Sequence, residues 1–401
     1  MKKSTVKVSV LVLAVLLGLY AGMRFLTKIE PDQKKVVVLY GENSVKYPEV
    51  RASLLGMDVT GKIITEDNID YSVLGEYQIR YLYRLFGILP LAEKHVQVNI
   101  VDMDSPEIGL PNGNVVFARS AEEDVFPAYT VTDNYDDEEH IRVSMDTEVT
   151  RTSDSVFESS LVACDSSENC TYKSLRVYVG DISEEEFEPG VFDLFRYDHA
   201  GTILRQDGNL LSEAEFGQIY FIGDSNFMNM SEYRWLNPSR VIARYALGPS
   251  SFDFPANYNN TPMSRSAAGL VHDLQPGMIV LHMGLSEAGN GDPVLLAQMY
   301  GDKLDELQEA APDASIFVSA ITPVVKGSTE AAASQTEINR ANYCLLQMCT
   351  EKHIPMIYSS EVFFDEEGYG DEQRFQPDGF HFQGDNFPVY TEYVRDVVKL
   401  P

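Results

Sequence analysis

An uncharged apolar run near the amino end is the feature that most constrains this chain. Residues 8–23 read VSVLVLAVLLGLYAGM, with Lys2, Lys3 and Lys7 before the run and Arg24 directly after it. This length suits a short membrane span or the apolar part of a secretory signal, because about 20 residues cross a bilayer. No small-residue cleavage motif or lipid-anchor cysteine follows, which favours an uncleaved signal anchor over a cleaved signal peptide. The flanking charges predict a cytoplasmic amino terminus and an external remainder.

The charge of the chain is divided unevenly between this anchor and the rest. Among 401 residues, 61 are acidic and 31 basic, for a net charge of −30. Residues 1–35 hold seven Lys or Arg and two Asp or Glu, which leaves 24 basic and 59 acidic residues and a net charge of −35 beyond them. Nucleic-acid binding is excluded, because it requires basic patches. A neutral polymeric substrate is favoured over a polyanionic glycan for the same reason.

Residues 36–182 have the pattern of two tandem β modules, at 36–104 and 105–182. Apolar and polar side chains alternate at 77–83 and 96–100, as in half-buried strands. The sequence VNIVD at 98–102 recurs as VYVGD at 177–181, and each copy has an apolar opening strand and a long hairpin before its last strand. Two β-sandwiches are therefore expected.

The second copy carries the more specific motifs. Residues 129–149 (YTVTDNYDDEEHIRVSMDTEV) and 162–179 (VACDSSENCTYKSLRVYV) resemble the bacterial immunoglobulin-like repeats of cell-surface proteins, whereas the first copy matches weakly. The resemblance implies a bacterial cell-surface location and modules that contact a cell-envelope partner. Their acidic cluster either coordinates Ca²⁺ or is a solvated loop, and the solvated loop is favoured; the cluster comprises Asp133, Asp136, Asp137, Glu138 and Glu139.

The four cysteines fall into two pairs. Cys164 and Cys170 bracket the turn-like DSSEN, so they either close a small disulfide at the mouth of a hairpin or remain free. Cys344 and Cys349 lie five residues apart in a predicted helix, where the helical rise and rotation hold them too far apart to bridge easily. This second pair is expected to be buried thiols.

After an acidic linker at 183–209, which includes SEEEFEPG, residues 210–401 have the pattern of an α/β domain. Helices are expected after Asp292-Pro293 and after Ser334, where Glu337 completes a capping box. Alternating strands and helices imply a parallel sheet with helices on both faces. The expected strands are the apolar runs at 218–222, 241–247, 278–283, 315–321 and 354–358.

Two short motifs lie where such a sheet would place its chemistry. Gly223-Asp224-Ser225 ends the first strand, and the carboxyl ends of parallel strands carry the sites of these folds. Near the end of the chain, FQPDGFHF places Asp378 three residues before His381 in one loop. A serine hydroxyl attacks an ester only when a base takes its proton and a carboxylate orients that base. His282, inside an apolar strand, is interpreted instead as a core residue.

The GDS motif followed by DGFH resembles the SGNH (GDSL-type) hydrolase family over about residues 210–401. The resemblance implies a flavodoxin-like parallel sheet, with Ser225 as nucleophile, His381 as general base and Asp378 as its orienting acid. It also implies an oxyanion hole formed by the N–H groups of Ser225 and Gly248 together with a side-chain amide.

The sequence departs from the family at that amide. After the third strand it reads Gly284-Leu285-Ser286-Glu287, with Ser286 in the amide position, and Asn290 is the candidate substitute. Losing one oxyanion donor typically costs about 10²–10³ in rate. A slower esterase, a rearranged hole and a decayed site therefore all remain open.

The leading hypothesis is a membrane-anchored extracellular serine esterase that removes small acyl groups, above all O-acetyl, from cell-envelope or extracellular carbohydrate. No cofactor or metal is expected for this chemistry. One alternative is an O-acetyltransferase that uses the same nucleophile. Another is a non-catalytic surface adhesin or scaffold with a decayed hydrolase domain.

Overall fold

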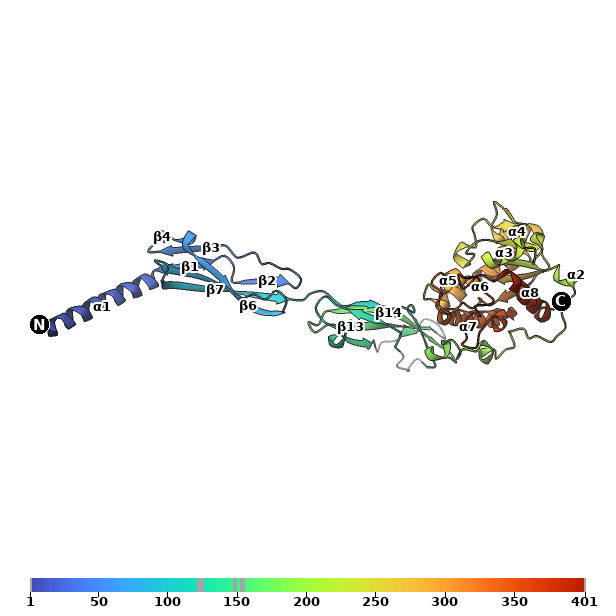
Figure 1. The fold of residues 1–401 in the computed structure, drawn as a ribbon, viewed down its shortest axis with the longest axis horizontal. Coiled ribbons are helices and arrows are strands. Elements are labelled where there is room, and N and C mark those ends of the chain that lie inside the picture. The colour runs from blue at the N-terminus through green and yellow to red at the C-terminus, as the bar shows by residue number, and fades with distance from the viewer. Residues whose placement is uncertain (1, 121–125, 147–149, 152–155, 400–401) are drawn as a thin grey trace. The chain divides into compact units, whose positions relative to one another are not determined.

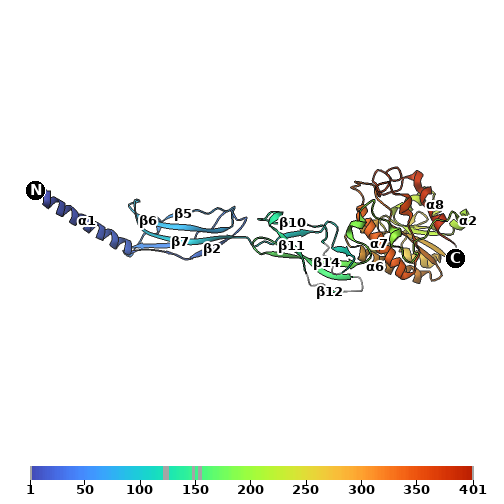
Figure 2. The same cartoon turned by 90° about the horizontal axis from the view of Figure 1, so that it is seen from below.

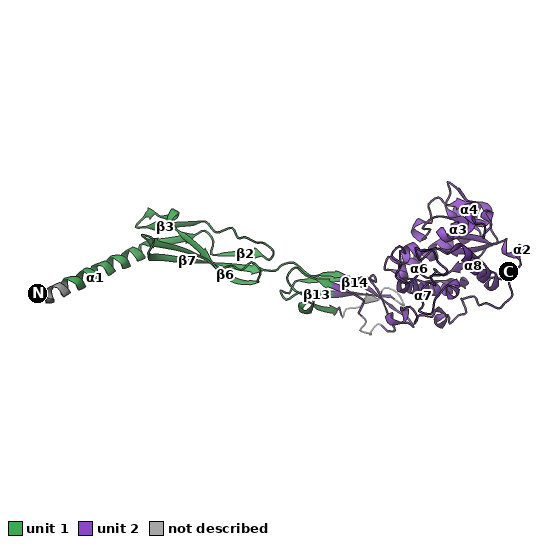
Figure 3. Cartoon of the chain, viewed as in Figure 1, with its two compact units in different colours: residues 1–108, 131–144, 162–172 green, residues 109–130, 145–161, 173–401 purple. Residues whose placement is uncertain are grey.

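The computed structural model describes residues 2–120, 126–146, 150–151 and 156–399. The chain forms two compact units, which Figure 3 shows in different colours. Residues 1–108, 131–144 and 162–172 form unit 1, and residues 109–130, 145–161 and 173–401 form unit 2. This division runs through the second predicted β module and so differs from the predicted boundaries after residues 104 and 182. Residues 147–149, which end the first quoted immunoglobulin-like motif, lie outside the described residues.

Unit 1 begins with a single long helix, α1 (Lys2–Phe25) (Figure 1). Its segment Val8–Phe25 is long and apolar enough to cross a membrane, and a signal sequence would meet the same criterion. The strand β1 (Thr27–Pro31) starts two residues after the helix ends. β structure therefore begins within the 1–35 segment that was predicted to be tail and anchor only.

Two small sheets enclose the apolar core of unit 1, which includes Ile79, Val96 and Val98. One sheet has the order β1-β3-β4, with β3 at Val50–Leu54 and β4 at Met57–Asp58. The other has the order β2-β7-β6-β5, from β2 (Lys35–Leu39), β7 (Leu89–Val101), β6 (Gly75–Leu85) and β5 (Ile64–Asp67).

The following segment also forms two sheets. One has the order β11-β13-β14-β9, with β12 on β13, and the other pairs β8 with β10. Their bounds are β8 (Glu107–Gly109), β9 (Val115–Ala118), β10 (Thr130–Thr132), β11 (Arg142–Met145), β12 (Thr150–Arg151), β13 (Val156–Cys164) and β14 (Cys170–Val179). Cys164 and Cys170 form a disulfide between β13 and β14, which is one of the two alternatives that the sequence left open.

The internal repeat is visible in the strand pairing. β2 pairs in parallel with β7, which places Val36 opposite Val98. β9 pairs in parallel with β14, which places Val116 opposite Val177. Both copies thus join their opening strand to the strand that carries the repeated motif. The immunoglobulin-like assignment itself stays a prediction.

Unit 2 contains the predicted parallel sheet. Its seven strands have the order β18-β17-β16-β15-β19-β20-β21. Five of these strands, in the order β16-β15-β19-β20-β21, pair in parallel. This is the 2-1-3-4-5 order of flavodoxin-like sheets. The hairpin β17–β18 adds an antiparallel edge that was not predicted. The bounds are β15 (Tyr220–Gly223), β16 (Val241–Ala243), β17 (Asn257–Tyr258), β18 (Thr261–Pro262), β19 (Met278–His282), β20 (Ser315–Ser319) and β21 (Met356–Ile357).

Helices cover both faces of this sheet, as predicted (Figure 2). On one face Ile222 and Ile279 pack with α4 (Ala267–Leu274), α5 (Leu285–Ala288), α6 (Pro293–Ala310) and α7 (Gln335–Lys352). On the other face Phe221 and Val280 pack with α3 (Ser225–Glu232) and α8 (Phe387–Val397). The short helix α2 (Glu213–Phe216) precedes the sheet. The caps follow the sequence, since the side chains of Asp292 and Ser334 accept backbone N–H groups at the starts of α6 and α7.

The predicted linker at 183–209 is part of the core of unit 2 rather than a separating segment. It contains the 3-10 helices η3 (Glu184–Phe187) and η4 (Leu194–Tyr197). Phe187, Leu194 and Ile203 are buried in the same apolar cluster as the sheet, and Ile203 forms a bridge with Met356 of β21. Its acidic residues are interrupted by apolar side chains, and these decide where the segment packs.

Candidate active site

Ser225 is placed by a sharp turn from the first parallel strand into a helix. β15 ends at Gly223, Asp224 caps α3, and Ser225 is the first helical residue. A Cβ at Gly223 would approach the carbonyl oxygen of His282 and the ring of Phe227, so only glycine fits this turn without rearrangement. The strand order reverses between β15 and β19, and open sheets bind ligands at such a switch point.

The structure brings Ser225 together with the two residues predicted from the carboxyl-terminal loop. Ser225 Oγ lies 2.8 Å from Nε2 of His381, across 156 residues of sequence. Nδ1 of His381 lies 2.7 Å from Oδ2 of Asp378. The side chains of His381 and Asp378 are each about four-fifths buried. A hydroxyl, an imidazole and a carboxylate in this order have the geometry of a serine-hydrolase triad.

The Asp378–His381 loop is held by its own hydrogen bonds. Oδ1 of Asp378 accepts the backbone N–H groups of Phe380 and His381, each at 3.1 Å. Gly379, between Asp378 and Phe380, has a φ of +80°, a conformation that favours glycine. Ser328 donates its hydroxyl to the carbonyl oxygen of Asp378 at 2.7 Å, which ties the loop to a neighbouring segment. The loop therefore presents the imidazole in one orientation.

The charge of Asp378 is stabilised at this position. Partial burial acts to raise its pKa, but hydrogen bonds from the His381 side chain and from the backbone of His381 and Phe380 outweigh burial and hold the pKa below its ordinary value. The carboxyl group is therefore ionised at neutral pH. Ionisation allows it to accept a hydrogen bond from the Nδ1–H group of His381, which leaves Nε2 free to accept the proton of Ser225.

Asn226 also holds the Asp378–His381 loop, a role that was not predicted from the sequence. This residue is 1% exposed. Its Oδ1 accepts the N–H of Phe382 at 3.0 Å, and its Nδ2 donates to the carbonyl oxygen of Phe380 at 3.4 Å. One side chain thus links the residue after Ser225 to both neighbours of His381. In the sequence, only its position directly after the GDS motif could have pointed to this role.

The predicted oxyanion residues Gly248, Ser286 and Asn290 do not form a hydrogen-bonded group with Ser225 among the described residues. The N–H of Gly248 donates to Ser251 Oγ at 3.0 Å rather than pointing to an open position. Ser286 lies in the first turn of α5, and Asn290 is exposed. Within the described part of the chain, no hydrogen bond joins the side chain of Ser286 or Asn290 to the Ser225–His381 pair.

Glu287 occupies this corner and was not predicted there. A Cβ at Gly248 would collide with the Glu287 carboxyl group, so the glycine allows this close approach. Oε1 of Glu287 accepts the N–H of Ser250 at 3.0 Å, while its Oε2 is buried without a partner among the described residues.

His282 is a core residue, as predicted. It is 1% exposed, and its ring packs against Phe227 and Tyr390. Burial lowers its pKa, so the imidazole is neutral at pH 7. Its Nε2 lies 3.9 Å from the Asp224 carboxyl group, one residue before Ser225. His282 therefore packs beside the turn that carries Ser225, and among the described residues no hydrogen bond joins it to the Ser225 hydroxyl.

Exposed aromatic side chains follow β16, the strand next to the one that leads to Ser225. Gly223 of β15 pairs with Ala243 of β16, so Ser225 and Tyr245 each follow their strand by two residues at the same edge of the sheet. Tyr245 is 60% exposed, and Phe254 farther along the same segment is 52% exposed. Both rings are exposed near the end of the sheet that carries Ser225, and the Arg244 guanidinium lies 5.1 Å over the Phe254 ring.

Comparisons with known proteins give structural similarities only. No family model matches the sequence, and no curated protein matches it. A GDSL-like lipase from Bacteroides thetaiotaomicron is similar at 14% identity over 50% of this chain and 95% of that chain, with a TM-score of 0.34. A carbohydrate esterase of family 3 from Talaromyces cellulolyticus is similar at 14% identity over 44% and 93%, with a TM-score of 0.32. The periplasmic domain of a lipopolysaccharide acetyltransferase from Salmonella ser. Paratyphi A is similar at 14% identity over 52% and 98%, also with a TM-score of 0.32.

Proposed function

We propose that this chain is a serine esterase that removes small acyl groups, above all O-acetyl, from carbohydrate. The observation that carries the proposal is the continuous hydrogen-bonded path from Ser225 through His381 to Asp378, at 2.8 and 2.7 Å. This path gives the serine hydroxyl a base in hydrogen-bond reach, and gives the base an ionised partner.

The chemistry follows from these three groups. Ser225 Oγ attacks the ester carbonyl carbon while Nε2 of His381 takes the hydroxyl proton, and Asp378 stabilises the imidazolium that forms. The leaving sugar oxygen receives that proton, which leaves an acyl group on Ser225. Water, activated by the same imidazole, then releases the acid. The N–H of Ser225, at the first position of α3, has no partner inside the helix and is available to the oxyanion.

The choice of carbohydrate rests on the surface around the serine. Tyr245 and Phe254 are exposed aromatic rings at the same sheet edge, with the Arg244 guanidinium 5.1 Å over the Phe254 ring, and the C–H faces of sugar rings pack on aromatic rings. The net charge of −35 beyond residue 35 disfavours polyanionic substrates. A neutral acetylated glycan satisfies both conditions.

We place the enzyme outside the cell, attached through α1. The apolar segment Val8–Phe25 supports the attachment. The disulfide between Cys164 and Cys170 supports an oxidising compartment. Digestion of intact cells with an added protease tests this location, since an external domain is removed and a cytoplasmic one is protected.

Turnover of p-nitrophenyl acetate by the full chain in detergent micelles tests the reaction. Ser225→Ala is expected to abolish turnover above background, while Ser264→Ala, at an exposed serine of the same unit, is expected to leave it unchanged. Labelling with a fluorophosphonate probe provides a second readout. Equal turnover and labelling by Ser225→Ala and the unaltered chain would refute the proposal. Release of acetate from an acetylated oligosaccharide, compared with transfer to an added acceptor, separates an esterase from a transferase.

A further inference from the structure

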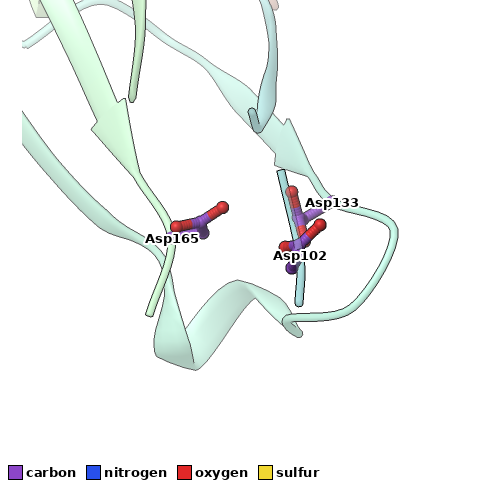
Figure 4. A group of neighbouring side chains, drawn as sticks. All are labelled: Asp102, Asp133 and Asp165. Atoms are coloured by element: carbon purple, nitrogen blue, oxygen red, sulfur yellow. The ribbon is translucent and has the colours of Figure 1, made fainter. Parts of the chain in front are cut away.

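Three aspartates gather in unit 1, far along the chain from the candidate active site. Asp102 directly follows β7, Asp133 directly follows β10, and Asp165 directly follows β13. One carboxylate oxygen from each lies within 4.8 Å of the other two (Figure 4). Carboxylates at this spacing repel one another unless a positive charge lies between them.

Two of these carboxylates have an oxygen that is buried and has no partner. Asp102 is 6% exposed, and its Oδ2 makes no hydrogen bond to any described residue. Asp133 Oδ1 is likewise buried and unpartnered. Burying a charged oxygen without a partner is costly. No Lys, Arg or His within the described residues forms an ion pair with any of the three aspartates.

The remaining oxygens are fixed by hydrogen bonds from the protein. Asp102 Oδ1 accepts the N–H of Asp104 at 3.2 Å. Asp133 Oδ2 accepts two backbone N–H groups, at 2.9 and 3.0 Å. Asp165 accepts the backbone and side-chain N–H groups of Asn169 at 2.8 and 2.7 Å. These contacts hold the aspartates in place while one oxygen each of Asp102 and Asp133 is left without a partner.

We propose that Asp102, Asp133 and Asp165 bind a divalent cation, and that the cation is Ca²⁺. The three ligands are hard carboxylate oxygens with no His or Cys among them, which excludes a zinc-type donor set. Ca²⁺ binds oxygens at about 2.3–2.6 Å, so two ligands on opposite sides of one ion lie up to about 5 Å apart. Mg²⁺ requires about 2.0–2.1 Å and a tighter group. Three protein carboxylates within 4.8 Å of one another suit Ca²⁺, which takes several protein oxygens in flexible geometry, better than Mg²⁺, which usually keeps several waters and binds one or two carboxylates.

This site differs from the one that the sequence suggested. Of the acidic run at 133–139, only Asp133 takes part. Asp136 instead accepts hydrogen bonds from the backbone and hydroxyl of Ser166, at 2.9 and 2.7 Å, and Asp137 contacts His140. A cation bound by the three aspartates would tie the segment after β7 to the turns after β10 and β13. Bound Ca²⁺ therefore holds these three parts of unit 1 together, and its removal loosens them.

Calcium titration of the full chain in detergent micelles, after removal of metals with EDTA and dialysis, tests the site directly. Isothermal titration is expected to detect one Ca²⁺ per chain, with a Kd of about 10⁻⁴–10⁻³ M, the range of extracellular modules. Tm is expected to rise with Ca²⁺ concentration, and Mg²⁺ is expected to act at least tenfold more weakly. Absence of Ca²⁺ binding up to about 10 mM, ten times the upper end of that range, would overturn the proposal. An equal response to Mg²⁺ would overturn the assignment to Ca²⁺.

Two variants distinguish the loss of this Ca²⁺ site from a general effect of removing negative charge. Asp102→Asn and Asp133→Asn each keep the size of the side chain and are expected to weaken Ca²⁺ binding at least tenfold. Because each also relieves repulsion between carboxylates, neither is expected to lower Tm in the absence of Ca²⁺. Asp137→Asn removes an exposed acid from the same loop and is expected to bind Ca²⁺ as the unaltered chain does. Unchanged Ca²⁺ affinity in both cluster variants would refute the site.

Discussion

Replacing Asp378 by asparagine is the most discriminating test of the Ser225–His381–Asp378 arrangement. The amide oxygen of asparagine can still accept the two backbone N–H groups that Asp378 Oδ1 accepts at 3.1 Å. The amide nitrogen, however, replaces Oδ2, which lies 2.7 Å from Nδ1 of His381. An amide N–H is a donor, so Nδ1 must become an acceptor and the ring proton must move to Nε2.

The expected loss follows from that change of tautomer. With its proton on Nε2, His381 cannot accept the proton of Ser225, and the negative charge that stabilises the imidazolium is also absent. In serine-hydrolase triads this substitution lowers kcat by about 10⁴. The site here is about one-fifth exposed at Asp378, and we expect a loss of about 10³–10⁴, which corresponds to about 4–5.5 kcal/mol in the activation barrier.

Turnover of p-nitrophenyl acetate and thermal unfolding should be measured on the same samples. Asp378→Asn is expected to unfold near the Tm of the unaltered chain because the loop keeps its backbone hydrogen bonds. Asp378→Ala provides the comparison, since it leaves two N–H groups without their acceptor and is expected to lower Tm. A loss of less than tenfold in kcat for a folded Asp378→Asn chain would refute the assigned role.

Three further predictions concern residues around the site and in the core. Asn226→Ala removes the hydrogen bond to Phe382 N–H and is expected to lower kcat about 10–100-fold through misplacement of the catalytic loop, with serine labelling by a fluorophosphonate slowed but retained. Tyr245→Ala is expected to raise KM for an acetylated oligosaccharide about 3–10-fold, an effect of the size of one lost aromatic contact, without changing turnover of p-nitrophenyl acetate; equal effects on both substrates would contradict a role in sugar binding. Burial raises the pKa of Cys344 to about 12, so the thiol stays protonated at pH 8. Iodoacetamide at this pH is expected to leave Cys344 unmodified in the native chain and to alkylate it in denaturant. Rapid labelling of the native chain would show that α7 opens.

The parts of the site that sequence predicted are those with short-range signals. Ser225 follows a buried strand within two residues, and Asp378 and His381 share one loop, so local patterns identified all three. Asn226 had no such signal, because its partners Phe380 and Phe382 lie about 155 residues away and meet it only after folding. The position of Glu287 beside Gly248 likewise depends on how the loops after β16 and β19, the strands on either side of β15, approach each other.

The segment at 183–209 shows how a composition-based prediction can fail. Its acidic residues and its Pro-Gly pair are typical of a linker, yet Phe187, Leu194 and Ile203 are buried with the sheet. Asn339 of α7 donates to the carbonyl oxygen of Phe187 at 2.8 Å, which fixes the segment further. A few apolar side chains at irregular spacing were enough to outweigh the average composition, because burial depends on individual side chains.

The sequence by itself determined the apolar amino-terminal segment, the alternation of strands and helices after residue 210, the helix caps at Asp292 and Ser334, and the two motifs of the candidate active site. Each of these features depends on residues that lie close together in the sequence, within one or two helical turns or strands. Only the tertiary structure decided which distant groups meet: Ser225 with His381, and Asp102 with Asp133 and Asp165. Periodicity reports which face of an element is buried, but the path of the chain between elements determines which buried faces and charges become neighbours.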